Sequence, residues 1–302
     1  MRIALIDVDG HNFPNIPLMK LSAWHKAHGD SVEWYEPLFS KDIDICYMSK
    51  VFTFTPDYDA PVNAGKVIKG GTGYTYPDGG MPLDDEVEHV YPDYSIYYER
   101  IPETRNTAYG FLTRGCPRGC DFCVVKKKEG ARSVKVADLS EFWRGQKNIV
   151  LLDPNMFACK DWRELAGQLI DSGAYVDFSQ GCDIRIMTEE MAVAIRSMRI
   201  RRIHFAWDRY FDKDFILPKL KMFKNLTGWS YEKLGVYVLT NFNTTHEQDL
   251  ERVEMLKEIG FNPYVMIYDK EKLPAKHVTR RLQRWCNNRR IFRSVPFSEY
   301  SG

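Results

Sequence analysis

The segment Gly110-Phe-Leu-Thr-Arg-Gly-Cys116-Pro-Arg-Gly-Cys120-Asp-Phe-Cys123 decides how the rest of the chain is interpreted. Cys116, Cys120 and Cys123 fall close together, directly after a strand-like run at 109–113. Thiolates are soft ligands that suit iron–sulfur clusters or zinc. Most iron–sulfur sites use four cysteines, whereas this loop offers three. A cluster held here would therefore keep one iron open to an outside ligand.

Outward from this loop, strand-like runs alternate with helical segments. The runs after 109–113 occupy 149–152, 175–178, 203–206, 235–239 and 264–267. Three residue pairs resemble the capping boxes that open helices, namely Asp138 with Glu141, Asp161 with Glu164, and Thr245 with Gln248. This alternation implies parallel strands joined by right-handed crossovers. We predict an α/β fold with a partial (β/α)6 barrel over 109–270, in which the loops after the strand ends carry the chemistry.

The segments on either side of the predicted barrel have different patterns. Residues 1–72 alternate strand, helix and strands, and 53–108 are mostly rich in turn-forming residues. We therefore predict that 1–108 comprise a shortened Rossmann-like α/β appendage and a linker. Residues 271–302 are predicted to form a basic C-terminal helix and tail, because Val278, Leu282, Trp285 and Cys286 follow helical spacing with arginines between them.

Composition narrows the class of protein. The 302 residues carry 42 Lys and Arg against 41 Asp and Glu, so the whole molecule does not attract nucleic acid or membranes electrostatically. The start MRIALIDVDG is typical of a strand rather than of a signal peptide, and no apolar run is long enough to span a membrane. Seven cysteines, three clustered and four scattered, do not indicate a disulfide framework. We expect a cytoplasmic protein.

The spacing C-x3-C-x2-C, with Phe122 before the last cysteine, resembles the signature of the radical S-adenosylmethionine (radical SAM) superfamily. The resemblance covers about 109–270. It implies a [4Fe-4S] cluster on Cys116, Cys120 and Cys123, with the amino and carboxylate groups of SAM on the open iron and Phe122 beside the adenine. One electron, from a flavodoxin- or ferredoxin-type reductant, would cleave SAM to a 5′-deoxyadenosyl radical that modifies a substrate not identified by the sequence.

The resemblance also suggests residues that contact SAM. Arg185, just beyond the strand at 175–178, is expected to pair with the SAM carboxylate, because a guanidinium matches a carboxylate in two-pronged fashion. Gln180 and Asp183 are expected to contact ribose or substrate. The alternative is a surface turn with an Asp183–Arg185 salt link.

Further polar residues follow the other strands. The family's GGE-like segment for the SAM amine is missing after 149–152, and Asn155 or Asp153 is expected to replace it, unless the turn makes only local hydrogen bonds. Asp208 and Asn241 are expected near ribose or substrate. His204, in mid-strand, is interpreted as a packed core histidine.

Several alternatives remain open at this stage. A structural zinc site would need a fourth ligand such as Cys159, Cys182 or His204, and the cysteines could also be unliganded. A cobalamin-dependent radical SAM methyltransferase is suggested by the N-terminal segment, but Asp9-Gly10-His11 does not complete the D-x-H-x-x-G motif of the axial histidine. A non-catalytic iron–sulfur electron carrier or sensor is a third option. The basic C-terminus is either a solvated helix or a contact for nucleic acid or an acidic peptide.

Overall fold

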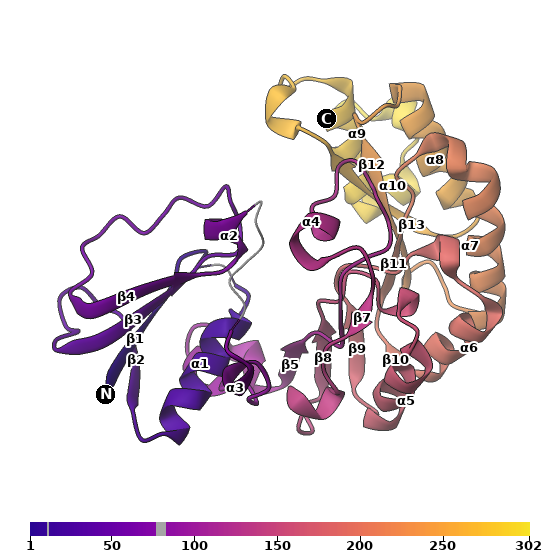
Figure 1. Ribbon diagram of the computed structural model, residues 1–302. Coiled ribbons are helices and arrows are strands. Elements are labelled where there is room, and N and C mark those ends of the chain that lie inside the picture. Colours follow the sequence, from indigo (N-terminus) through magenta and orange to yellow (C-terminus); the bar gives the residue numbers. More distant parts are fainter. Residues whose placement is uncertain (11, 77–82) are drawn as a thin grey trace. The chain divides into compact units, whose positions relative to one another are not determined.

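The protein is described by a computed structural model covering residues 1–10, 12–76 and 83–302 (Figure 1). The chain divides into two compact units, Met1–Gln168 and Leu169–Gly302. The predicted division into 1–108, 109–270 and 271–302 is a different one, and it stays a prediction. Each unit is built mainly on parallel strands, as the alternating sequence pattern predicts.

The first unit begins with a four-stranded parallel sheet in the order β2-β1-β3-β4. Its elements are β1 (Arg2–Asp7), α1 (Ile16–Ala27), β2 (Ser31–Trp34), β3 (Ile43–Ser49) and β4 (Ala64–Gly70). Alternate residues of β1 face opposite sides of the sheet. Ile3 and Leu5 pack against Leu18 of α1, and Ala4 and Ile6 pack in a second cluster with Met48. This part of the chain thus has a parallel α/β fold, with α1 on one face of the sheet.

This appendage is short because the connection between β3 and β4 contains no helix, and all of its residues, 50–63, are described. Tyr58 and Val62 of this connection pack on the sheet instead of a helix. The linker that follows holds short helices, namely α2 (Thr72–Thr75), α3 (Asp85–Glu88), η1 (Tyr94–Tyr97) and η2 (Pro102–Arg105). Tyr94 fixes its end, because its hydroxyl accepts from the backbone of Tyr109 at 3.0 Å and donates to the carbonyl of Phe142 at 2.8 Å.

The rest of the first unit carries the cysteine motif. Its elements are β5 (Thr107–Gly110), β6 (Thr113–Arg114), α4 (Val125–Glu129), β7 (Val134–Lys135), η3 (Leu139–Glu141), β8 (Asn148–Leu151) and η4 (Met156–Ala158). β5 pairs with β8 in parallel, and β6 pairs with β7 in antiparallel fashion. The single strand expected at 109–113 is therefore two strands with a break at 111–112. The predicted helix start at Asp138 opens only a 3-10 helix, although the backbone of Asp138 does bond to Glu141.

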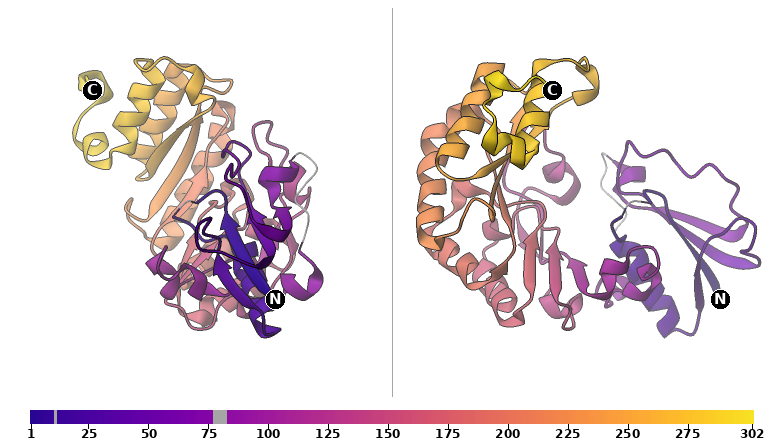
Figure 2. Two further views of the ribbon diagram at one scale, coloured as in Figure 1. Left: turned by 90° about the vertical axis from the view of Figure 1, so that its left-hand side faces the viewer. Right: turned by 180° about the vertical axis from the view of Figure 1, so that it is seen from behind.

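The second unit contains the later parallel strands. α5 (Trp162–Ser172) leads into it, and β9 (Tyr175–Phe178), β10 (Arg199–Ile200), β11 (Ile203–Ala206), β12 (Leu234–Thr240) and β13 (Asn262–Ile267) follow. β9 pairs with β10, and β11, β12 and β13 form one sheet. The four strands predicted in this region are confirmed to within two residues. The helices α6 (Glu189–Ser197), α7 (Lys213–Thr227) and α8 (His246–Glu258) run along one side of these strands (Figure 2).

The C-terminal segment folds onto the second unit. α9 (Val278–Asn287) buries Leu282, Trp285 and Cys286, as the helical spacing predicts, and α10 (Arg289–Ser294) and η8 (Phe297–Glu299) follow. The side-chain amides of Gln283 and Asn287 bond to the backbone of Val265 at 2.8–3.1 Å, and so satisfy polar groups of β13.

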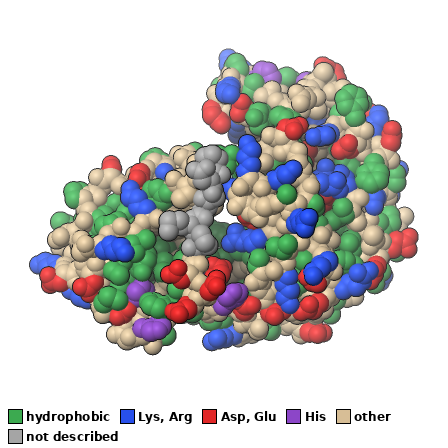
Figure 3. Space-filling model, viewed as in Figure 1, with side chains coloured by type: hydrophobic (Ala, Val, Ile, Leu, Met, Phe, Trp, Pro, Cys, Tyr) green, Lys and Arg blue, Asp and Glu red, His purple; other side chains and the backbone are tan. Residues whose placement is uncertain are grey.

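The arginines of this segment are largely engaged within the protein. Arg280 bonds to the carbonyls of Lys270 and Leu273, and Arg293 bonds to Phe261 and Asn262. Arg289 and Arg290 are exposed. Basic and acidic side chains are interspersed on the face shown in Figure 3. No helix among the described residues has the length and apolar character needed to cross a bilayer.

Candidate metal centre

The cysteine motif lies on a loop whose two ends are held together. β6 and β7 form its neck, and the backbone N–H of Cys116 donates to the carbonyl of Gly130 at 3.2 Å. Gly115 makes the neck narrow, since it has a φ of +81° and an added Cβ would overlap the carbonyl oxygen of Arg132. Only glycine combines that backbone angle with so close an approach. Gly115 thus determines where the loop begins.

The three cysteines are arranged along this loop. Cys116 and Cys120 are half-buried and Cys123 is exposed, and the backbone N–H of Cys123 donates to the carbonyl of Cys120 at 3.0 Å. Phe122, between them, is half-buried. Among the described residues, no three side chains of His, Cys, Asp or Glu are arranged as a metal site. The structure therefore places the three thiols on one short loop without gathering their sulfurs around a point.

Asp153 holds the start of this loop from the end of β8. It is buried, and its carboxylate accepts from the backbone of Leu112 at 3.0 Å and from the backbone and hydroxyl of Thr113 at 2.5 and 2.7 Å. Burial raises the pKa of Asp153 to about 6. These bonds turn the chain off β5 and explain the break in the predicted strand. Asp153 is consequently a support for the cysteine loop, which leaves Asn155 as the residue available for a ligand.

Asn155 lies directly beside the first cysteine. Its side-chain Nδ2 donates to Sγ of Cys116 at 3.6 Å, and the residue is only 3% exposed. Its Oδ1 is buried and accepts no hydrogen bond from any described residue. Buried acceptors are nearly always satisfied in folded proteins. A buried acceptor without a partner, beside a predicted cluster ligand, is suited to a donor on a bound molecule, so Asn155 fits the predicted co-substrate.

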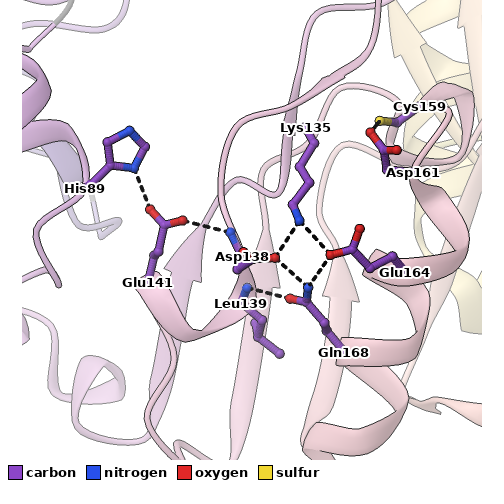
Figure 4. Close-up of polar contacts among 9 residues, drawn as sticks. All are labelled: His89, Lys135, Asp138, Leu139, Glu141, Cys159, Asp161, Glu164 and Gln168. Carbon is purple, nitrogen blue, oxygen red and sulfur yellow. Dashed lines mark hydrogen bonds and ion pairs between the residues drawn. The ribbon is translucent and has the colours of Figure 1, made fainter.

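A polar network ties the return strand of the loop to the neighbouring helix (Figure 4). Lys135 of β7 pairs with Asp138 and Glu164, both at 2.7 Å, and Gln168 of α5 donates to Asp138 at 2.6 Å. Figure 4 also shows Cys159, whose thiol donates to Asp161 at 3.9 Å. Cys159, one candidate for a fourth zinc ligand, is thus engaged elsewhere in this structure.

A lysine connects the cysteine loop to the segments that follow β3 and β4. Lys128, in α4, donates to the hydroxyl of Thr72 at 3.1 Å and to the carbonyl of Val51 at 3.4 Å. Burial lowers the pKa of Lys128. Asp9, two residues after β1, accepts from the backbone of Val51 and Phe52 and so orders the same region. His11, the nearest match to an axial cobalamin histidine, lies outside the described residues.

The remaining predicted site residues belong to the second unit. Arg185 pairs through Nε with Asp183 at 2.7 Å, which is the salt link of the alternative considered above, and their side chains are 21% and 8% exposed. Burial raises the pKa of Asp208 to about 6, against the opposing effect of nearby Arg185. Asp183, Arg185 and Asp208 thus form one charged group.

Two further predicted contacts, Gln180 and Asn241, lie at the ends of strands of the same unit. Gln180 is an exposed turn residue. Asn241, with a φ of +61°, donates from its amide to the carbonyl of Tyr268 at 2.8 Å and so joins the ends of β12 and β13. Their assignment to ribose or substrate stays a prediction.

His204 is packed as expected. Its ring stacks on Tyr237 with centroids 4.8 Å apart, and it fills the space left by Gly235, where an added Cβ would overlap the ring. Burial, with Arg202 and Arg289 nearby, lowers the pKa of His204 to about 4.

Sequence reasoning missed a buried arginine at the same strand ends. Arg252 is 0% exposed and donates to the carbonyls of Trp207 at 2.6 Å and Leu239 at 2.7 Å, and it pairs with Asp249 at 2.6 Å. It ties β12 to the end of β11. The i, i+3 spacing of Asp249 and Arg252 in a predicted helix was the only signal, and it is also typical of exposed pairs.

Two solved structures share this architecture. The radical SAM methyltransferase TsrM from Kitasatospora setae, with cobalamin and a [4Fe-4S] cluster bound, aligns at a TM-score of 0.62 and 11% identity over 88% of this chain and 74% of that one. TsrM with tryptophan substrate and the SAM analog aza-SAM aligns at 0.60 and 12% identity, over 87% and 72%. The fold of this chain is similar to that of a radical SAM enzyme.

At such low identity the likeness concerns the fold alone. It agrees with the resemblance carried by the cysteine motif, which rests on the sequence alone. No family model and no curated protein sequence matches the chain.

Proposed function

We propose that this chain is a radical SAM enzyme that reductively cleaves SAM at a [4Fe-4S] cluster to form a 5′-deoxyadenosyl radical and modify a substrate. One observation carries the proposal. Cys116, Cys120 and Cys123 have the C-x3-C-x2-C spacing of that superfamily and lie on the loop after β5 and β6 of a chain with the radical SAM fold. The motif and the fold are independent, and they agree.

The local structure supports three thiolate ligands and one open iron. Three thiols share one short loop, and its neck is held by the hydrogen bond from Cys116 to Gly130 and by the pairing of β6 with β7. The bound cluster would supply the electron that breaks a carbon–sulfur bond of SAM, while the protein binds and orients both. The unpaired Oδ1 of Asn155 is suited to accept from the SAM ammonium.

The finer assignments belong to the same proposal. The six longer parallel strands from β5 to β13 would form the partial (β/α)6 barrel, with 1–108 as the appendage. Phe122 is proposed beside the adenine, Arg185 at the SAM carboxylate, and Gln180, Asp183, Asp208 and Asn241 at ribose or substrate. Among these, Asp183, Arg185 and Asp208 have the charges and partial burial that support such a role.

The environment and partners are also proposals. A flavodoxin- or ferredoxin-type reductant in the cytoplasm would supply the electron. Contact with an anionic substrate such as a nucleic acid or peptide is supported by exposed Arg289 and Arg290.

The test is anaerobic reconstitution with iron and sulfide, followed by incubation with SAM and dithionite. We expect a brown protein with four irons per chain that forms 5′-deoxyadenosine. Cys116→Ser, Cys120→Ser and Cys123→Ser should each lose the cluster, whereas Cys159→Ser, the matched control, should keep it. A non-catalytic carrier or sensor would hold a cluster and leave SAM intact, and a zinc protein would hold no iron. Either result would refute the proposal.

A second candidate is cobalamin-dependent methyl transfer, favoured by the carboxyl end of the N-terminal sheet. The strand order changes direction between β1 and β3, where ligands bind in sheets of this kind. Large apolar side chains are exposed after β2 and β3, with Leu38 82%, Phe39 80% and Phe54 78% exposed. The TsrM structure holds cobalamin.

Adding cobalamin to the anaerobic protein separates the two candidates. Methyl transfer requires a cobalamin spectrum that changes on binding and weakens in Phe54→Asp but not in Phe211→Asp, a control that is equally exposed in the other unit. An unchanged spectrum would remove the second candidate.

A further inference from the structure

We infer that Asn155 sets the reduction potential of the cluster by donating a hydrogen bond from its side-chain amide to the sulfur of Cys116. The inference rests on the proposed function in one respect, namely that Cys116 holds a cluster. It concerns a property of the cluster itself, which can be measured without SAM and without a substrate.

The geometry places the amide where it can act on that sulfur. Nδ2 of Asn155 lies 3.6 Å from Sγ of Cys116, and Asn155 is 3% exposed. Its backbone is held on two sides, because its carbonyl accepts from the hydroxyl of Ser133 at 2.9 Å and from the N–H of Ala158 at 3.1 Å. Ser133 is itself buried, next to β7. The amide is thus fixed relative to both ends of the cysteine loop.

Electrostatics gives the sign of the effect. Reduction adds one electron to the cluster and increases the negative charge on its sulfurs. An N–H that donates to a ligand sulfur stabilises the more negative state, and such hydrogen bonds are among the features that set iron–sulfur potentials. Burial strengthens the bond, since the local dielectric is low. The hydrogen bond therefore raises the potential and makes the cluster easier to reduce.

The oxygen of the same amide can accept a hydrogen bond from a bound molecule. Its Oδ1 is buried without a partner, on the opposite branch of the side chain from the sulfur contact. A donor bound at Oδ1 would polarise the amide and strengthen the N–H···S bond, because hydrogen bonds in series reinforce one another. Asn155 is in this sense a positioning residue that couples the donor site to the cluster ligand, in addition to any contact with SAM.

The test is a potentiometric titration of the reconstituted protein in the absence of SAM, followed by electron paramagnetic resonance. We expect Asn155→Ala to shift the reduction equilibrium about tenfold toward the oxidised cluster, which is about 59 mV more negative for one electron. Asn148→Ala is the matched control. Asn148 also has a buried Oδ1 without a described partner, but it stands at the start of β8, where its amide bonds to Asn106 and Thr107. The cluster of Asn148→Ala should therefore have the same reduction potential as that of the unaltered protein.

Two further measurements keep the inference testable if Asn155→Ala does not fold. Asn155→Asp keeps the shape but replaces the donor with an oxygen, and its potential should also become more negative. In the unaltered protein labelled with ¹⁵N-asparagine, the reduced cluster should show a weakly coupled nitrogen in pulsed electron paramagnetic resonance. An unchanged potential in a fully loaded Asn155 variant, or no coupled asparagine nitrogen, would overturn the inference. Failure of the unaltered protein to form any cluster would instead overturn the proposed function.

Discussion

The three glycines of the cysteine loop allow a graded test of how the neck positions the ligands. Gly115 has a φ of +81°, and an added Cβ would overlap the carbonyl oxygen of Arg132 and lie 3.0 and 3.1 Å from those of Glu129 and Gly130. Gly130 has a φ of +103° but nothing within 4 Å of the added Cβ. Gly119, between Cys116 and Cys120, has neither feature, since the nearest atom is the end of Lys126 at 3.7 Å.

The expected losses of unfolding free energy follow from these differences. Gly119→Ala should change stability by no more than about 0.5 kcal/mol, as surface substitutions do. Gly130→Ala should lose about 1–3 kcal/mol from backbone strain alone. Gly115→Ala adds to that strain an overlap with backbone atoms that cannot move aside, typically a further 1–3 kcal/mol. We expect a total of about 2–6 kcal/mol for Gly115→Ala.

Gly115→Ala should also lower the amount of iron that the protein binds. Gly115 precedes Cys116, whose backbone N–H closes the neck on Gly130. Opening the neck would separate the first cysteine from the other two. The assay is urea unfolding of the metal-free protein, together with iron and sulfide analysis after reconstitution. Gly115→Ala should bind markedly less iron than Gly119→Ala. Equal stability and equal iron in these two variants would refute the account of the neck.

Two other changes probe the second unit. Arg252→Met should lose about 3–5 kcal/mol of unfolding free energy, because it leaves Asp249 buried without its partner. The exposed control Arg290→Met should lose almost nothing. Similar losses in both variants would contradict the role of Arg252. Burial lowers the pKa of His204 to about 4 from 6.5, so the unfolded chain takes up the proton first and stability should fall by up to about 3 kcal/mol as pH drops from 6.5 to 4. In His204→Phe, which keeps the ring against Tyr237, this part of the pH profile should flatten, and an unchanged profile would show that His204 does not carry it.

The sequence predicted the strands well because their apolar runs are short and separated by clear helix signals. Runs at 175–178 and 203–206 match β9 and β11 exactly, and Thr245 with Gln248 forms the capping box that opens α8. Such signals depend on local residues, and local residues are what a sequence shows.

The departures arise where a distant side chain decides the local structure. The strand expected at 109–113 is interrupted because Asp153, 40 residues away from Thr113, binds its backbone. The arginines of the C-terminal segment alternate with apolar residues as in a solvated helix, yet Arg280, Arg284 and Arg293 bond to backbone carbonyls. Neither contact has a signature in the sequence around it.

The candidate site likewise combines features that the sequence shows with contacts that only the structure shows. The cysteine motif and its spacing were sufficient to predict a ligand loop, and the position of Asn155 after a strand was sufficient to suggest it as a contact. Its bond to Cys116 and its unpaired oxygen depend on the exact path of the chain after Asp153, and only the structure shows them. The role of Arg252 was hidden for a similar reason, because burial distinguishes it from an ordinary surface pair.

Mössbauer spectroscopy of the ⁵⁷Fe-reconstituted protein, before and after SAM is added, examines the open coordination position directly. If three thiolates hold the cluster, one of its four irons should change its spectrum when SAM binds, while the other three stay alike. Four irons that all remain unchanged, or a fourth protein ligand that persists with SAM present, would contradict the account.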